Sequence, residues 1–214
     1  EIPSTAAPKL TLSCLDENVA LIGISIEEGI VGAEVLPESD EVTSSFIRAA
    51  AGDSVYTLRT ENNFVASAPI VLDIDTGDSP CAMHLALEIG RHCEFELITQ
   101  ISGAAPWTGI LRSGRIGDGS ILNDVVIGHT DSGTLLRVDS IAIGRDAQVK
   151  AGTVSSGSER TKADLRYKMG ETGGHLNVLG SILSASDMHL DHHVEIHHHA
   201  PETFSRLDWH SACG

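Results

Sequence analysis

The pentapeptide Ile116-Gly117-Asp118-Gly119-Ser120 and three stretches built in the same way decide the fold of this chain. In each stretch an apolar residue precedes a glycine, two variable positions follow, and a small residue ends the motif. The other three are Ile89-Gly90-Arg91-His92-Cys93, Ile143-Gly144-Arg145-Asp146-Ala147 and Met169-Gly170-Glu171-Thr172-Gly173. Their leading glycines lie 27, 27 and 26 residues apart. This near-constant step predicts stacked coils of equal path length around one core, with each leading glycine at a turn that needs a positive φ.

The segments that follow these turns alternate as half-buried strands do. Cys93, Phe95 and Leu97 are apolar, and the glutamates between them are expected to face the other way. A step of about 27 residues is too short for a propeller blade and lacks the six-residue period of a hexapeptide helix. We therefore predict a mainly β protein, a parallel β-helix (solenoid) with about 27 residues and two or three strands per coil. A β-sandwich with regularly spaced turns is the alternative.

The N-terminal part carries the best helix signal of the chain, in residues 40–51. Asp40 or Thr43 is expected to cap this helix and Gly52 to end it. Strands are predicted at residues 19–26, 54–59 and 69–74. The chain is thus expected to consist of an α/β lead-in segment, residues 1–80, and a β-helix core, residues 81–214.

The composition excludes several classes of partner. Asp and Glu number 30 against 14 Lys and Arg, and the formal charge of -16 argues against binding to nucleic acid or to anionic membranes. The longest apolar stretch, residues 19–26, is far shorter than the roughly 20 residues of a spanning helix, and no export signal is visible. Cys14, Cys81, Cys93 and Cys213 are widely spaced, so we expect free thiols and neither a disulfide framework nor a zinc ribbon.

Histidine is concentrated near the C-terminus, where eight of the eleven fall between His175 and His210. In the densest run, Val194 and Ile196 are expected to face the core. An outward row is then predicted, consisting of Asp191, His193, Glu195, His197 and His199, with His192 and His198 on the opposite face. Imidazoles flanking a carboxylate suit zinc or ferrous iron, so this row is a candidate metal site. A solvated polar face is the alternative.

Other candidate groups are few. Cys213 lies near His210, and a thiolate beside an imidazole binds iron or transfers sulfur, although a small core residue is the alternative. Arg206 and Asp208, two residues apart on one strand face, are expected to form an ion pair. The sequence contains no nucleophile elbow, phosphate-binding loop or dinucleotide fingerprint, so no catalytic residues are predicted and the chain is not expected to be an enzyme.

The stretch His199-Ala200-Pro201-Glu202-Thr203-Phe204-Ser205-Arg206 resembles the H-x-A-P-x-T-x-S motif typical of the SufB/SufD family of iron-sulfur cluster assembly scaffolds. Upstream, Lys168-Met169-Gly170-Glu171, Leu176-Asn177-Val178-Leu179-Gly180 and Asp191-His192-His193-Val194-Glu195 are similar to the family's approach to that motif. Residues 43–74, which include Ala68-Pro69-Ile70, resemble the segment that precedes the β-helix in this family. The resemblance covers roughly residues 40–214.

This resemblance implies a right-handed parallel β-helix that pairs with a paralogous β-helix subunit, while a SufC-type ATPase docks elsewhere. It also implies a cytoplasmic scaffold subunit on which an iron-sulfur cluster is held transiently. SufD is favoured over SufB, although no single residue decides between them. In the family the β-helix continues past the point corresponding to Gly214 and carries the best-known functional Cys and His there, so none of those is assigned to this chain.

Two other functions compete with the scaffold. A carbohydrate-active β-helix enzyme, a lyase or hydrolase, needs aromatic platforms, and Phe, Trp and Tyr total only eight here. A metal-binding oligomerisation module using the histidine row is the second alternative. In either the scaffold or the module, a homo-oligomer is expected when the chain is alone, because a cut β-helix presents unpaired strand edges.

Overall fold

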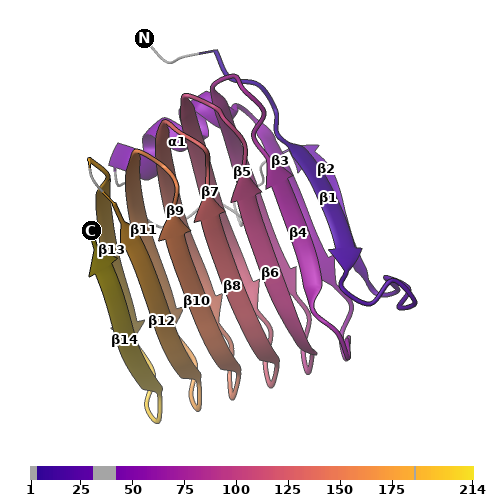
Figure 1. The fold of residues 1–214 in the computed structure, drawn as a ribbon. Helices are drawn as coiled ribbons and strands as arrows, with labels where there is room; N and C mark the ends of the chain where they lie inside the picture. The colour runs from indigo at the N-terminus through magenta and orange to yellow at the C-terminus, as the bar shows by residue number, and fades with distance from the viewer. Residues whose placement is uncertain (1–3, 31–41, 186) are drawn as a thin grey trace.

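The computed structural model of the protein describes residues 4–30, 42–185 and 187–214, which form two facing β-sheets and one helix (Figure 1). The helix is α1 (Val42–Ala51). The strands are β1 (Lys9–Cys14), β2 (Ile24–Ile30), β3 (Ser54–Thr60), β4 (Ile70–Asp75), β5 (Cys81–Ile89), β6 (Glu94–Ser102), β7 (Trp107–Ile116), β8 (Ile121–His129), β9 (Thr134–Ile143), β10 (Gln148–Ser156), β11 (Arg160–Met169), β12 (His175–Ser184), β13 (His189–His198) and β14 (Phe204–Cys213).

From β3 onward the chain passes from one sheet to the other with every strand, so each coil contributes one strand to each sheet. The first sheet has the order β1-β4-β6-β8-β10-β12-β14, and the second has the order β13-β11-β9-β7-β5-β3-β2. From β3 and β4 onward, neighbouring strands in both sheets are parallel. The result is a β-solenoid of about six turns with about 27 residues per turn, as the spacing of the glycines predicted.

The expected boundary at residue 81 falls between the first coil, β3 with β4, and the second, which begins at β5. The division of the chain into a lead-in and a core remains a prediction. At the N-terminal end β1 pairs with β4 and β2 pairs with β3, both antiparallel. The strand predicted at residues 19–26 instead spans Ile24–Ile30, because Gly23, with a φ of +81°, departs from the extended conformation just before it.

The four repeated glycines stack at equivalent corners of successive coils, as predicted. The residues that precede them are paired directly across the second sheet, Ile89 with Ile116, Ile116 with Ile143, and Ile143 with Met169. The predicted reason for the glycines was wrong, because their φ angles are not positive. The positive φ falls later in each turn, at His92, Gly119, Asp146 and Gly173.

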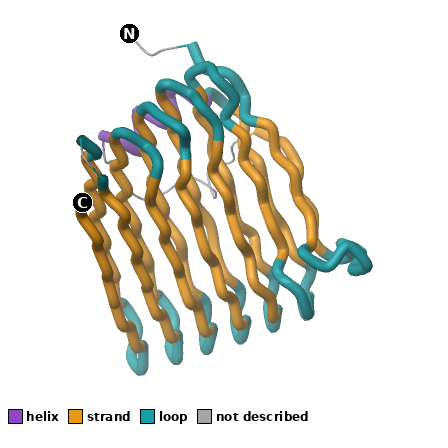
Figure 2. The backbone as a smooth tube through the Cα atoms, viewed as in Figure 1, coloured by secondary structure: helices purple, strands orange, loops and turns teal. Residues whose placement is uncertain are grey.

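Close contact between coils is what requires glycine at these corners. A Cβ atom at Gly90 would lie 2.6 Å from the carbonyl oxygen of Glu61 in the preceding coil, and one at Gly117 would collide with the backbone of Gly90. At Gly170 a Cβ would meet no atom within 4 Å. Figure 2 shows these turns as short loops at one end of the molecule.

Part of the outer face of the second sheet, over β5, β7 and β9, is covered by α1, which lies behind the sheets in Figure 1. Ile47 packs there on Leu111 and Val138, and Phe46 meets the ring of Trp107 edge-on. The helix ends before Gly52, whose φ of +74° suits a C-terminal cap. The expected cap Asp40 lies outside the described residues, and Thr43 lies within the helix. No helix in the described part of the chain has the length and apolar character needed to cross a membrane.

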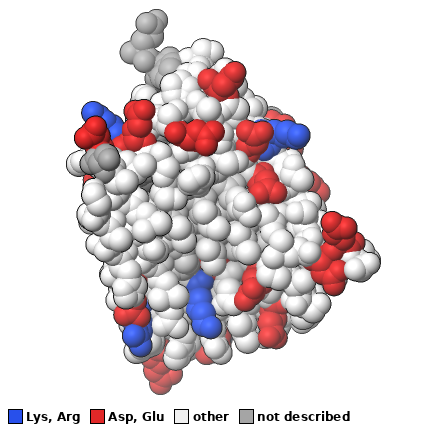
Figure 3. Space-filling view, viewed as in Figure 1, with Lys and Arg blue, Asp and Glu red and all other residues white. Residues whose placement is uncertain are grey.

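The outer face of the first sheet is largely uncharged over its middle, as Figure 3 shows. Ile98, Val125 and Leu179 lie in one row across this face, with Gly152 between the last two. Leu179 is 46 % exposed. The outer faces of the two sheets therefore differ, because α1 packs on part of the second sheet and an apolar row crosses the first.

We expect Gly117→Ala to destabilise the fold by about 1–3 kcal/mol, the usual cost of overpacking. The added methyl group has to displace the backbone of the preceding coil. The matched control is Gly170→Ala, which occupies the same corner in open space and should be neutral or slightly stabilising. Urea denaturation followed by circular dichroism measures both, and equal midpoints for the two variants would contradict the packing explanation.

Candidate functional site

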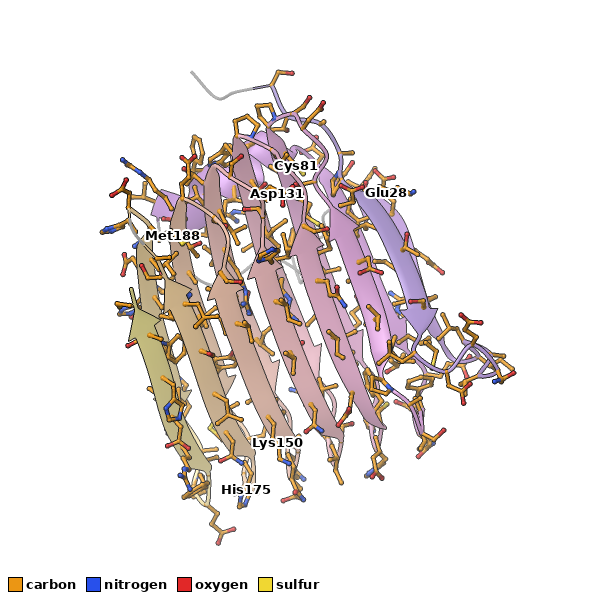
Figure 4. The ribbon with its side chains drawn as sticks, viewed as in Figure 1. Glu28, Cys81, Asp131, Lys150, His175 and Met188 are labelled. Carbon is orange, nitrogen blue, oxygen red and sulfur yellow. The ribbon has the colours of Figure 1, made fainter. Side chains whose placement is uncertain are left out.

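The histidine-rich segment forms β13, the edge strand of the second sheet, and the last coil with β14. Val194 and Ile196 pack against the core between the sheets, and strand alternation therefore turns their neighbours His193, Glu195 and His197 outward. The predicted facing agrees with the burial of Asp191, His193 and His197, which are exposed, and of His192, which is half-buried, whereas His198 is also exposed. Figure 4 shows His175 at the end of the molecule where β12 begins and Met188 at the opposite end, just before β13.

On the outer face, Glu195 lies between two imidazoles. His193 Nε2 is 2.9 Å from Glu195 Oε1, and His197 Nε2 is 3.1 Å from Glu195 Oε2. These two hydrogen bonds lower the pKa of the Glu195 carboxyl. The three side chains keep 53 %, 34 % and 49 % of their surface exposed, in the order His193, Glu195 and His197. Three of the five residues in the row predicted from the sequence therefore contact one another.

The other two members of the predicted row have different contacts. Asp191 forms an ion pair with Lys162 Nζ at 3.1 Å, and the His199 ring stacks on that of His197 with centroids 5.9 Å apart. Among the described residues, no group of three or more His, Cys, Asp or Glu side chains is arranged around a common point as metal ligands. Metal binding by the row remains a prediction.

His192 and His198, the two histidines predicted on the opposite face, contact the core and the final turn. His192 Nε2 lies 2.8 Å from Ser155 Oγ, and its ring contacts that of Trp209. His198 bridges the turn to β14, with Nδ1 2.7 Å from Thr203 Oγ1 and Nε2 2.9 Å from Ser205 Oγ. The hydroxyl residues of the H-x-A-P-x-T-x-S stretch thus hold the turn closed.

A buried ionic network crosses the middle of the core, and sequence reasoning missed it. Arg112 on β7 donates to Asp124 on β8 at 2.8 Å and to Asp139 on β9 at 2.7 Å. Arg137 also pairs with Asp139 and donates to Thr153 Oγ1 at 3.3 Å. The network therefore links the two sheets within a coil and also links one coil to the next.

The contacts within the network favour the charged forms of Arg112 and Asp139. Burial alone would lower the pKa of Arg112, but the carboxylates of Asp124 and Asp139 raise it overall. Burial opposes ionisation of Asp139 as well, and the guanidinium groups of Arg137 and Arg112 nevertheless lower its pKa. Burial raises the pKa of the neighbouring Tyr167, which therefore stays protonated. Burying charges of this kind carries a free-energy penalty, because the groups lose their contacts with water. The attraction between two carboxylates and two guanidinium groups offsets that penalty.

A signal for the network was present in the sequence. Ile110 and Ile116 on β7 face the core, and strand alternation places Arg112 and Gly114 between them on the same side. An arginine at an inward position needs a buried carboxylate, and Asp139 occupies the directly paired position on β9. The repeat alone could therefore have predicted this pair.

All four cysteines are free, as expected, with Cys81 and Cys93 buried and Cys213 exposed at the end of β14. Burial raises the pKa of the Cys81 thiol to about 11, so Cys81 is inert. His210 and Cys213 are three residues apart on one strand, and alternation therefore places them on opposite faces. Arg206 and Asp208 form the predicted exposed ion pair, with Nε and Oδ2 2.7 Å apart.

The comparisons with known proteins give one family. The family model described as "SUF system FeS cluster assembly, SufBD core domain" matches residues 73–214, from β4 to the end of the last coil. The search of curated proteins found no match.

The buried network predicts that Asp139→Ala will destabilise the fold by about 3–5 kcal/mol, because it leaves two buried guanidinium groups without their shared partner. Asp208→Ala is the matched control, since it removes the same group from an exposed pair, and it should cost no more than about 1 kcal/mol. Chemical denaturation measures both. Similar losses in the two variants would show that the network contributes nothing beyond a surface pair.

We also expect stability to fall as pH decreases from about 6.5 to about 4. Burial, with a smaller effect of a nearby arginine in each case, lowers the pKa of His84 and of His192 to about 4. Both imidazoles are then neutral in the folded chain and take up protons on unfolding, which favours the unfolded state in this interval. Melting temperatures at pH 7.5 and 5 should differ by several degrees, and the difference should shrink in the double variant His84→Gln, His192→Gln. An unchanged difference would assign the acid sensitivity to other groups.

Proposed function

Since the chain belongs to the SufBD family of the iron-sulfur cluster assembly system, we propose that it is a scaffold subunit, of SufD type, on which a cluster is assembled transiently. In this proposal it works in the cytoplasm with a paralogous β-helix subunit and a SufC-type ATPase. The observation that carries the proposal is the family match, which spans five of the coils from β5 onward. SufB type is the alternative within the family.

The last coil supports pairing with a second β-helix. β13 and β14 each pair on one side only within the described residues, with β11 and β12. An edge of this kind has backbone N–H and C=O groups ready to bind another strand. The Phe204 N–H donates to the carbonyl of Gly174, just before β12, and the Gly214 N–H donates to that of Ser184 at the end of β12. In a parallel ladder the direction alternates with each residue, so the Ser211 N–H points to the free edge.

The carbohydrate-active alternative is less well supported. A sugar-binding groove needs exposed aromatic rings, and four of the eight aromatic residues are paired with one another. The ring of Phe46 meets that of Trp107 edge to face, and the ring of Phe64 meets that of Phe95 in the same way in the core. We therefore prefer the scaffold.

Coexpression with a SufB-type paralogue and a SufC-type ATPase tests the proposal. We expect the three proteins to co-purify, and we expect the chain alone to form a dimer by light scattering. Ser211→Pro should weaken association with the paralogue at least about tenfold, because proline removes an N–H from the free edge while the bonds to β12 remain. Ser211→Ala is the matched control and should bind normally. No association with either partner, together with a strict monomer at high micromolar concentration, would refute the proposal.

A further inference from the structure

We propose that two copies of this chain associate through the outer face of the first sheet, with β8 on the two-fold axis of the dimer. This face is separate from the free edges of β13 and β14, which the scaffold proposal assigns to a paralogous subunit. The contact therefore goes beyond the scaffold function, and one copy can use both surfaces at the same time.

The central place of β8 in the first sheet permits this symmetry. The sheet has the order β1-β4-β6-β8-β10-β12-β14, so three strands lie on each side of β8. A two-fold axis parallel to β8 places β6 of one copy over β10 of the other, and β4 over β12. Each contact away from the axis then occurs twice, as in any isologous dimer. Figure 1 shows the strands of this sheet side by side in a broad, open face, and two such faces can pack with their strands nearly aligned.

The apolar row across this face is complementary to itself under the two-fold operation. Ile98, Val125 and Gly152 are in register and point outward, because the residues that alternate with them belong to the core. On the axis Val125 meets Val125 of the second copy, and Ile98 of each copy lies over Gly152 of the other. Since Gly152 has no side chain, it leaves a hollow between Val125 and Leu179 that can receive Ile98. Ile127 extends the apolar surface along the axis.

The charged residues of the central strands are complementary as well. On β6, β8 and β10, which the structure describes completely, the outward Asp, Glu, Lys and Arg residues are Glu94, Glu96 and Lys150. Glu96 and Lys150 lie in one row on either side of Asn123, at equal distances from β8. The axis therefore places Lys150 of each copy opposite Glu96 of the other, across about 10 Å that the two side chains can span together. Figure 4 shows Lys150 toward the end of the sheet, beyond the apolar row.

The size of the face suits a dimer. At a strand spacing of about 4.8 Å the five strands from β4 to β12 are about 24 Å wide, and a strand of nine residues is about 30 Å long. The resulting area of roughly 700 Å² per copy is close to the ~800 Å² that each partner buries in a standard interface. The formal charge of -16 opposes association, although salt screens it beyond about 8 Å. Asp73 and Gln100 interrupt the apolar surface near β4, so we expect a dissociation constant on the order of micromolar.

Sedimentation equilibrium of the untagged chain in about 0.15 M NaCl tests the proposal. We expect a dimer. Glu96→Lys and Lys150→Glu should each raise its dissociation constant at least about tenfold, because each substitution opposes like charges at two places in the interface. The double variant Glu96→Lys, Lys150→Glu exchanges the two charges and should restore the dimer. Lys162→Glu is the matched control, because it makes the same change on the outer face of the second sheet and should leave association unchanged.

Glu96 and Lys150 are exposed, so circular dichroism should show the wild-type fold in all these variants. Ser211→Pro alters only the free edge of β14 and should keep the dimer. A dimer that is lost in Ser211→Pro and kept in Lys150→Glu would overturn the proposal, as would a double variant that fails to regain association. A monomeric wild type would also overturn it and would leave the face to another occupant, such as an amphipathic helix of a different subunit. None of these results decides the scaffold proposal, which is tested by co-purification with a paralogue and an ATPase.

Discussion

Neighbouring coils of this protein are separated by the distance between two hydrogen-bonded strands. This short distance limits the size of the side chain that fits at each corner. Where the chain leaves the second sheet, the backbone of one coil touches the backbone of the next, and only glycine fits at Gly90, Gly117 and Gly144. Because the corners are in register, each coil has to have nearly the same length. Equal length in turn keeps the inward positions of all coils in line, which produces one continuous core.

The same alignment determines where a charged side chain can be buried. Such a side chain destabilises the core unless a partner of opposite charge lies at a matching inward position. Arg112 replaces an apolar residue at an inward position, and its two carboxylate partners come from the facing sheet and from the next coil. A shift of one residue in either strand would turn those groups outward and leave a buried guanidinium unpaired. We infer that the network fixes the register of the central coils, while the apolar residues around it supply most of the stability.

The period of the glycines and the alternation of side chains were sufficient to predict the solenoid, its coil length and the two faces of β13. Both signals depend on local geometry that repeats in every coil. The role of the glycines could not be read in this way, because their crowding comes from residues 26 to 29 positions earlier, in the preceding coil. The sequence also placed Cys213 beside His210, where proximity along a strand suggests contact but alternation prevents it. The ionic network was missed because the strands were judged singly and not as registered pairs.

Adjacent histidines on β13 show how strongly the facing of a side chain decides its chemistry. His192 points inward, bonds to Ser155 and stays neutral because burial lowers its pKa to about 4. His193, the next residue, points outward and bonds to Glu195 in contact with solvent. Protonation of the first couples to folding, whereas a change at the second does not disturb the core. The stability of the last coil and any ligand chemistry on its surface can therefore be altered independently, although the residues responsible are neighbours in the chain.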